Sequence, residues 1–325
     1  MRRAFIWLSV VIGIVLFGVL MFTADWTGAL VLLERANPEY LALYIGATIL
    51  ILFLSAVRWN VIARSKGIDI SIGLSCSYRL ARFAVSFITP GPRVGGDAVG
   101  AALVTRHSNG RRKVSYGEAL STMVIDRMVE LQTFAFLFFV WVIALALLGG
   151  IPPALKVLLV TLSSLLLLLM LTLGLGAMRG NIMITKVLRR LAKKSSTINE
   201  IDRFETTLTA FYRKQPRDFF LAHLIAGVAW LVSLVEYYAI LKVLGFDVPL
   251  YGIFVIYSFV GLAYALPVPL AIGTLETAQA TAFSIIGLPP VGGILLAFVT
   301  RMRDLTISAV GFIILAYHGI LPYNK

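Results

Sequence analysis

The sequence predicts an all-α polytopic membrane protein with about six full transmembrane helices and two re-entrant hairpins of broken helix, arranged as an inverted repeat. The chain is 59% hydrophobic and only 14% charged, and its mean hydropathy is +0.90. A chain of this composition has too few charged side chains to cover a water-facing surface. Its apolar runs are about as long as a bilayer is thick, and two of them are interrupted by proline and glycine.

Six apolar runs predict full transmembrane helices, because about 20 helical residues span the hydrocarbon core. We place them near residues 4–23, 40–58, 115–148, 154–177, 218–243 and 290–318. The first run follows Arg2 and Arg3 as a signal peptide would, but it has no clear cleavage site of small residues. We therefore expect it to be retained as the first span.

Two further apolar stretches are broken in the middle. The stretch near residues 74–105 is interrupted by T-P-G-P-R-V-G-G-D at 89–97, and the stretch near residues 251–286 by L-P-V-P-L-A-I-G-T at 266–274. Prolines remove backbone donors, and the groups that a break frees cannot face lipid. We therefore expect each stretch to form two half-helices that dip into the membrane and are covered by protein or water.

Basic residues in the connections predict the orientation, since Lys and Arg are enriched in cytoplasmic loops. Residues 59–116 and 178–217 are rich in Lys and Arg, whereas residues 23–39 and the short connection around Asp247 are not. The sequence thus predicts a multi-pass protein of the cell membrane with a cytoplasmic N-terminus. The formal net charge of +13 is explained by topology, so nucleic acid is not an expected partner.

The basic region 178–217 allows two interpretations. Apolar residues recur in it at helical spacing among charged ones, namely Ile198, Ile201, Phe204, Leu208 and Phe211. This pattern is typical of a helix that lies on the membrane surface. The alternative is a solvated linker whose basic residues only hold the topology.

A long-range self-match predicts the domain organisation. Pro90, Pro92 and Gly96 recur in the same order and at the same spacing as Pro267, Pro269 and Gly273, and Arg127 recurs as Arg303 if a single gap is allowed. We therefore expect one membrane domain over residues 1–325, with repeat A at about 40–148 and repeat B at about 218–318. Helix 154–177 and the basic segment 178–217 link the two repeats. With the predicted orientation the hairpins enter from opposite sides, an arrangement found in many secondary transporters.

Charged residues fall within two predicted helices, where an isolated charge is costly and should pair or bind a ligand. Helix 115–148 contains Glu118, Asp126, Arg127 and Glu130, and helix 290–318 contains Arg301, Arg303 and Asp304. Arg127 reaches Glu130 at a spacing of three residues. Internal ion pairs, Arg127 with Asp126 or Glu130 and Arg301 with Asp304, are one interpretation. Contact with a substrate is the other.

The arginines and the broken helices suit an anionic phosphate head group, because a guanidinium and the free N–H groups of a helix N-terminus both bind phosphate. Asp97 and Thr274 stand where helix N-caps are expected. Glu118, Asp126, Glu130, Glu236 and Asp304 are candidates for ion pairing or coupling, and Glu236 and Glu276 also for a cationic head group. The predicted head-group site comprises Arg93, Gly95, Gly96, Asp97, Arg127, Gly273, Glu276, Arg301 and Arg303.

Metal and disulfide chemistry are not expected. Cys76 is the single cysteine, and His107, His223 and His318 are too scattered to form a metal-ligand pattern. We therefore expect neither a metal nor a cofactor.

Three elements in order resemble a known family: F-I-T-P-G-P-R-V-G-G-D at 87–97, S-T-M-V-I-D-R at 121–127, and A-L-P-V-P at 265–269 followed by Gly273 and Glu276. They are similar to the lysylphosphatidylglycerol synthase transmembrane family, also called flippase-like or UPF0104 proteins. The resemblance implies the membrane half of the bacterial multiple peptide resistance factor, which moves aminoacylated phosphatidylglycerol between leaflets. We expect no synthase domain in this chain. Gly100 and Leu270-Ala271 depart from the family pattern, so other phospholipids and polyprenyl-phosphate lipids stay open as substrates.

Three functions follow as hypotheses. The first is a flippase-type transporter of a phosphate-bearing lipid, an anionic phospholipid or a polyprenyl phosphate, and not an enzyme. The second is a membrane-embedded transferase in which Asp126 and Glu130 act as acid and base, although no D-D-x-x-D, H-E-x-x-H or G-x-S-x-G motif occurs. The third is an accessory subunit of a separate lipid-modifying enzyme, with residues 178–217 as the docking surface. Whether the chain forms a homodimer is left open.

Overall fold

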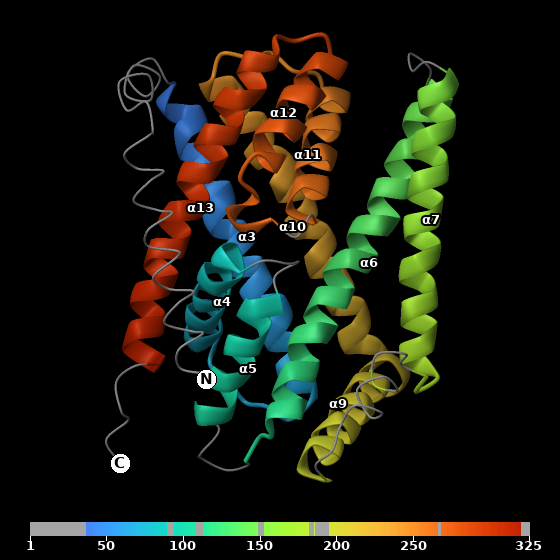
Figure 1. The fold of residues 1–325 in the computed structure, drawn as a ribbon, viewed down its shortest axis with the longest axis vertical. Coiled ribbons are helices and arrows are strands. Elements are labelled where there is room, and N and C mark those ends of the chain that lie inside the picture. Colours follow the sequence, from blue (N-terminus) through green and yellow to red (C-terminus); the bar gives the residue numbers. More distant parts are fainter. Residues whose placement is uncertain are drawn as a thin grey trace. The chain divides into compact units, whose positions relative to one another are not determined.

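Every secondary-structure element in the described part of the chain is a helix (Figure 1). The computed structural model describes residues 37–89, 94–107, 113–148, 153–181, 185, 195–265 and 268–319. The elements are α3 (Pro38–Ser65), α4 (Ile72–Ile88), α5 (Val94–His107), α6 (Tyr116–Leu148), α7 (Pro153–Met178), α9 (Ser195–Lys214), α10 (Pro216–Val243), α11 (Leu250–Ala265), the 3-10 turn η1 (Pro269–Ala271), α12 (Thr274–Ile285) and α13 (Pro290–Gly319).

Local sequence signals fix where the long helices begin and end. Four helices start at a proline (Pro38, Pro153, Pro216 and Pro290), whose fixed φ and missing N–H suit the first helical position. Four helices are followed by a glycine at positive φ (Gly67, Gly180, Gly245 and Gly287). In each of those four cases the amide after the glycine donates to the carbonyl five residues earlier, which closes the helix end as a Schellman motif.

The apolar helices confirm an all-α membrane protein. Four described helices are long and apolar enough to cross a bilayer: Pro38–Ser65, Tyr116–Leu147, Leu159–Met178 and Pro216–Val243. The predicted helix 290–318 also forms, as α13, but its central charges Arg301, Arg303 and Asp304 make it too polar to belong to this set. The predicted span 4–23 lies outside the described residues. The count of six full spans and two hairpins therefore stays a prediction.

Residue contacts group the chain into two compact units. The first unit takes its described residues from 1–50, 79–99 and 232–325, and the second takes them from 51–78 and 100–231. The chain passes between the units within α3, α4, α5 and α10. Each candidate site below lies within one unit.

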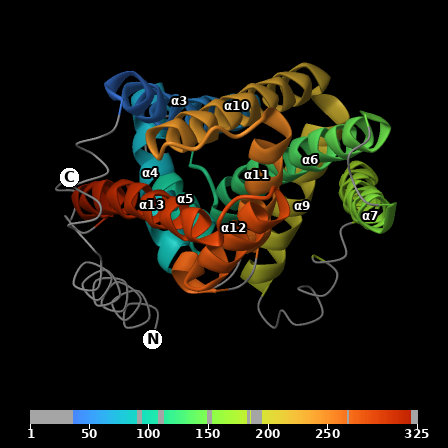
Figure 2. The same ribbon diagram turned by 90° about the horizontal axis from the view of Figure 1, so that it is seen from above.

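In the second unit, α6 packs against α7 and α9 (Figure 1), and Figure 2 shows α6 and α7 from above. The region for which the sequence allowed a surface helix or a solvated linker forms α9, so the linker interpretation is wrong for residues 195–214. Leu208 and Phe211 of α9 are buried in a core cluster with Ile125 of α6 and Ala177 of α7. The apolar face of α9 thus packs on protein rather than on lipid.

In the first unit, α12 packs against both α11 and α13 (Figure 1). Both stretches that the sequence predicted to be broken do form pairs of short helices, α4 with α5 and α11 with α12. Their depth in a membrane stays a prediction.

Gly96 sets how closely α4 and α5 approach. A Cβ added at Gly96 would lie 2.1 Å from the Arg82 carbonyl oxygen, so only glycine fits at this position of α5. The glycine predicted from sequence as a head-group contact therefore has a packing role in the hairpin.

Candidate functional site

The break between α11 and α12 is held by one buried arginine of α13. Leu270 and Ala271 have positive φ values of 55° and 50°, which is costly for residues with a Cβ. Neither residue therefore continues a regular α-helix, and their carbonyls need other hydrogen-bond donors. The Arg301 guanidinium donates to the Leu270 carbonyl at 2.9 Å and to the Ala271 carbonyl at 3.3 Å. The Arg301 side chain is 4% exposed. It therefore satisfies backbone groups that lipid could not satisfy.

Glu276 joins the same arrangement from α12. Its carboxylate accepts a hydrogen bond from the Gly273 amide at 2.9 Å and pairs with the Arg301 guanidinium at 2.5 Å. Two expectations are corrected here. Gly273 is the N-cap and Thr274 is the first helical residue, since a positive φ of 79° ends the turn one position earlier. Arg301 pairs with Glu276 and not with Asp304.

Asp97 bridges the first hairpin instead of capping it. Helix α5 begins at Val94, so Asp97 lies in its first turn and the expected N-cap role is wrong. The Asp97 carboxylate pairs with the buried Arg82 guanidinium of α4 at 2.6 Å. Gly95 stands near Thr89, whose hydroxyl would lie 2.5 Å from an added Cβ. Arg93 lies outside the described residues.

We call Glu236, Arg303 and Asp304 the α13 cluster. The Arg303 guanidinium contacts Glu236 of α10 at 2.9 Å and Asp304 at 2.9 Å. Thr48 donates its hydroxyl to Glu236 at 2.5 Å, and Tyr264 donates its hydroxyl to the second carboxylate oxygen of Asp304. The cluster holds one guanidinium and two carboxylates, and both carboxylate side chains are at most 5% exposed.

We call Arg58, Asp126, Arg127 and Glu130 the α6 cluster. The Arg58 guanidinium of α3 contacts Asp126 at 2.7 Å and Glu130 at 3.1 Å. Arg127 contacts Glu130 at 2.9 Å, which confirms the predicted pairing at a spacing of three residues. Asp126 pairs with Arg58 and is 1% exposed. Two guanidiniums therefore face two carboxylates. Arg58 contacts both Asp126 and Glu130, which the sequence proposed as an acid and a base.

Glu118 does not lie in the middle of its helix. The Ser115 amide donates to the Glu118 carboxylate at 3.1 Å, and the Glu118 amide donates to the Ser115 hydroxyl at 3.2 Å. This reciprocal pair is a capping box at the start of α6. The S-x-x-E spacing at 115–118 is visible in the sequence and identifies Glu118 as a capping residue.

Sequence reasoning missed Arg58 and Arg82. Both are buried, at 2% and 1% exposure. Arg58 lies at the end of a predicted span, and Arg82 lies in the basic region 59–116, whose arginines the sequence attributes to topology. Helix α3 in fact continues to Ser65, well past its predicted end at 58, so Arg58 lies within the helix. An arginine inside a helical run is itself a signal of a buried partner.

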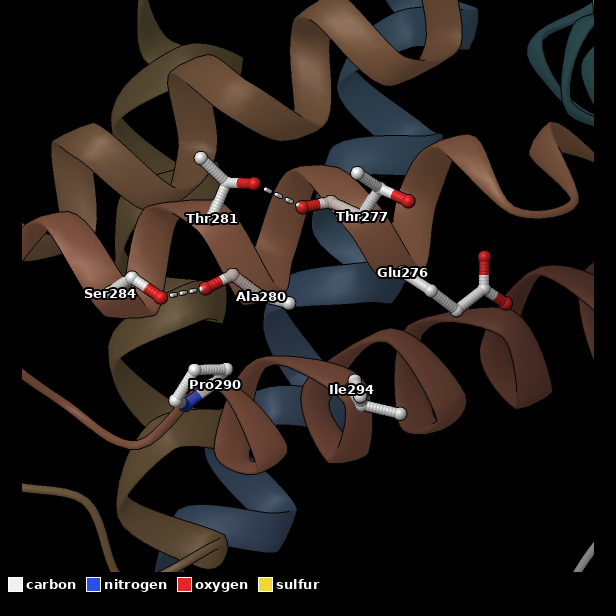
Figure 3. Close-up of a pocket in the computed structure, with 7 residues that line it drawn as sticks. All are labelled: Glu276, Thr277, Ala280, Thr281, Ser284, Pro290 and Ile294. Carbon is white, nitrogen blue, oxygen red and sulfur yellow. Dashed lines mark hydrogen bonds between the residues drawn. The ribbon is translucent and has the colours of Figure 1, made fainter.

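A groove runs between α12 and α13 in the first unit (Figure 3). Its volume is about 340 Å³, and it is lined by Glu276, Thr277, Ala280, Thr281, Ser284, Pro290 and Ile294. The hydroxyls of Thr277, Thr281 and Ser284 each donate to the carbonyl four residues earlier, at 2.7, 2.7 and 3.0 Å. Their oxygens keep lone pairs for a ligand. The wall formed by α12 is therefore polar, with Glu276 at one end, and the wall formed by Pro290 and Ile294 of α13 is apolar.

Comparison with known proteins gives the family. A model of the lysylphosphatidylglycerol synthase TM region matches residues 6–311. The chain belongs to this family. It is also 23% identical over 303 residues to a UPF0104 membrane protein of Methanocaldococcus jannaschii, covering 90% of this chain and 87% of that one. No solved structure matches the chain.

Two other relatives match over a shorter part. A UPF0104 membrane protein of Pyrococcus horikoshii is 27% identical over 125 residues, or 38% of this chain and 36% of its own length. One of Methanothermobacter thermautotrophicus is 30% identical over 106 residues, 33% of this chain and 30% of its own. The chain thus matches only about a third of the length of these two relatives.

Among the described residues, no group of three or more His, Cys, Asp or Glu could hold a metal ion.

Proposed function

We propose that this protein is a flippase-type transporter that moves a phosphate-bearing lipid, a phospholipid or a polyprenyl phosphate, between the two leaflets of the membrane. The observation that carries the proposal is the α12–α13 groove, which has one polar and one apolar wall. A lipid has the same division, with a head group that needs hydrogen-bonding partners and chains that do not. Half-helices with exposed polar atoms are also where secondary transporters place their substrates.

The hydroxyls of α12 form the side of the groove that would contact a lipid head group. Thr277, Thr281 and Ser284 recur at spacings of four and three residues, so they lie along one face of α12. All three are exposed, and the Glu276 side chain is 35% exposed. These oxygens accept hydrogen bonds, so they favour a lipid whose head group carries donors beside its phosphate.

Two partly exposed arginines, Arg127 and Arg303, favour a phosphate in the head group. Arg127 and Arg303 side chains keep 17% and 19% exposure although each is held by a carboxylate. A guanidinium has five N–H donors, so it can hold a carboxylate with some and offer others to a phosphate. Arg301 is engaged with the backbone of the break, so we assign it the task of holding α12 in place.

The membrane topology of the proposed transporter is the one that the sequence predicts. Repeats A and B, at about 40–148 and 218–318, are inverted relative to each other, and the N-terminus is cytoplasmic in the cell membrane. A carboxylate such as Glu236 or Asp304 would couple transport to protons in this scheme.

The test is lipid exchange between leaflets in liposomes that contain the purified protein and a labelled phospholipid. We expect wild-type protein to speed the exchange, and Thr281→Trp, which fills the groove, to slow it at least tenfold. Leu262→Trp is the matched control, because Leu262 is an exposed residue of α11 that does not line the groove. No acceleration by the wild type would refute the proposal. Equal rates for both variants would move the lipid path away from this groove.

A further inference from the structure

The end of α7 places an arginine at the boundary of its apolar surface. Gly180 has φ +65°, the Asn181 amide donates to the Gly176 carbonyl at 2.9 Å, and the Gly180 amide donates to the Ala177 carbonyl at 3.2 Å. These bonds stop the helix at Met178. Arg179 therefore follows directly after a helix whose exposed residues are mostly leucine, among them Leu165, Leu168, Leu169, Leu171, Leu173 and Leu175.

A second arginine reaches the same place from α9. A pocket of about 430 Å³ is lined by Leu175, Met178, Arg179 and Arg213, all within the second unit. Arg213 stands in the last turn of α9, which packs against α7. Both arginines are exposed, and within the described residues neither forms a salt bridge. Of the described residues, none that lines the pocket is acidic.

The charge balance at the pocket favours an anion. Two helices end beside it, and each C-terminus carries about half a negative charge. Two guanidiniums therefore leave about one positive charge facing the pocket. Like charges held around one cavity repel each other, and an anion between them removes that repulsion.

The surroundings of the pocket identify what carries the anion. The candidate span Leu159–Met178 ends at the pocket, so the arginines lie at the level where hydrocarbon gives way to lipid head groups. Leu175 and Met178 are 49% and 41% exposed and form the apolar part of the lining. A free phosphate would use only the arginines, whereas a phospholipid would use both parts.

We propose that this pocket binds the head-group phosphate of an anionic phospholipid from the leaflet at the C-terminal end of α7. Arg179 and Arg213 hold the phosphate, and the first carbons of the acyl chains lie against Leu175 and Met178. The site shares no residue with the α12–α13 groove, so it goes beyond the proposed transport function and can be present whether or not transport is found.

The test is native mass spectrometry of the full chain in detergent, titrated with phosphatidylglycerol or with phosphatidylcholine of the same chains. The double variant Arg179→Gln/Arg213→Gln should bind phosphatidylglycerol about 25-fold more weakly, at about fivefold for each arginine. Phosphatidylcholine binding should change little. The pair Lys113→Gln/Arg203→Gln is the matched control, because it removes the same charge from exposed positions outside the pocket.

Three results separate the proposal from its competitors. Loss of phosphatidylglycerol in the pocket variant alone, with retention in Arg179→Lys/Arg213→Lys, supports it. An equal loss in the control pair would overturn it, since binding would then follow total charge. Displacement of the bound lipid by millimolar inorganic phosphate would also overturn it, because the pocket would then be a site for free anions.

Discussion

The α6 cluster and the α13 cluster bury charge in different ways. In the α6 cluster two guanidiniums face two carboxylates, whereas in the α13 cluster one guanidinium faces two carboxylates that also accept hydroxyl donors. Each cluster joins two helices, since Arg58 of α3 pairs with Asp126 of α6 and Glu236 of α10 pairs with Arg303 of α13. The comparison teaches that two buried clusters can differ in charge balance, so that the loss of one arginine should cost more where no second arginine is present.

The largest effect is expected in the α13 cluster. Arg303→Gln leaves both Glu236 and Asp304 buried without a cation in the cluster, and we expect it to lower the free energy of unfolding by about 5 kcal/mol. Thermal unfolding in detergent measures this. Glu236→Gln should change stability by less than about 1 kcal/mol, because it removes the excess negative charge while its amide oxygen still accepts from Thr48. Equal losses in both variants would contradict the charge count.

A smaller loss is expected in the α6 cluster. Arg58→Met takes the Arg58 guanidinium away from the buried Asp126, but Arg127 still holds Glu130, so we expect a loss of about 3 kcal/mol. The double variant Arg58→Met/Asp126→Leu removes the pair and should recover most of that loss in the same unfolding measurement. If the double variant is as unstable as the single one, packing around Arg58 and not charge is responsible.

A backbone substitution extends the comparison to the break that Arg301 holds. Ala271→Gly should stabilise the protein by about 0.5–1 kcal/mol, because glycine adopts the left-handed conformation without the cost that alanine bears. Ala263→Gly is the control, since this residue lies inside α11 and glycine there should cost about 1 kcal/mol. Unfolding midpoints of the two variants should therefore shift in opposite directions.

The last effect depends on pH and concerns Lys66, directly after α3. Burial lowers the pKa of the Lys66 ammonium to about 8, against the attraction of Asp218. The folded protein then binds fewer protons than the unfolded chain between pH 8 and the usual lysine pKa, so stability should rise with pH across that window. Lys66→Met should flatten this rise in unfolding measurements at pH 7 to 10. If stability rises as steeply with pH in Lys66→Met as in the wild type, another titrating group causes the rise.

Patterns along the chain predicted the helices well and their partners poorly. Proline, glycine and hydropathy located both broken stretches and the four apolar helices, because these signals act within one segment. The sequence also predicted the pair Arg127–Glu130, which lies within one turn of α6. It could not show that Arg58 meets Asp126 or that Glu236 meets Arg303, since each pair joins two helices far apart in the chain and only packing brings them together.

The S-x-x-E signal at Ser115 and the extended end of α3 show a second reason for the misses. Hydropathy alone places helix ends poorly, so it puts Glu118 inside a span although this residue caps one, and it puts Arg58 at an end although this residue lies within a helix. Capping signals place Glu118 correctly and leave Arg58 as the residue to explain.

Arg301 also has a consequence for how relatives of this protein can vary. Its fork satisfies two carbonyls and one carboxylate at once, and lysine, with a single ammonium, could not reproduce that planar geometry. Relatives that keep residues with a Cβ at positions 270 and 271 should therefore keep arginine at 301 together with an acid at 276. Those with glycine at the break should tolerate other pairs, so correlated substitution at these four positions would trace the shape of the break through the family.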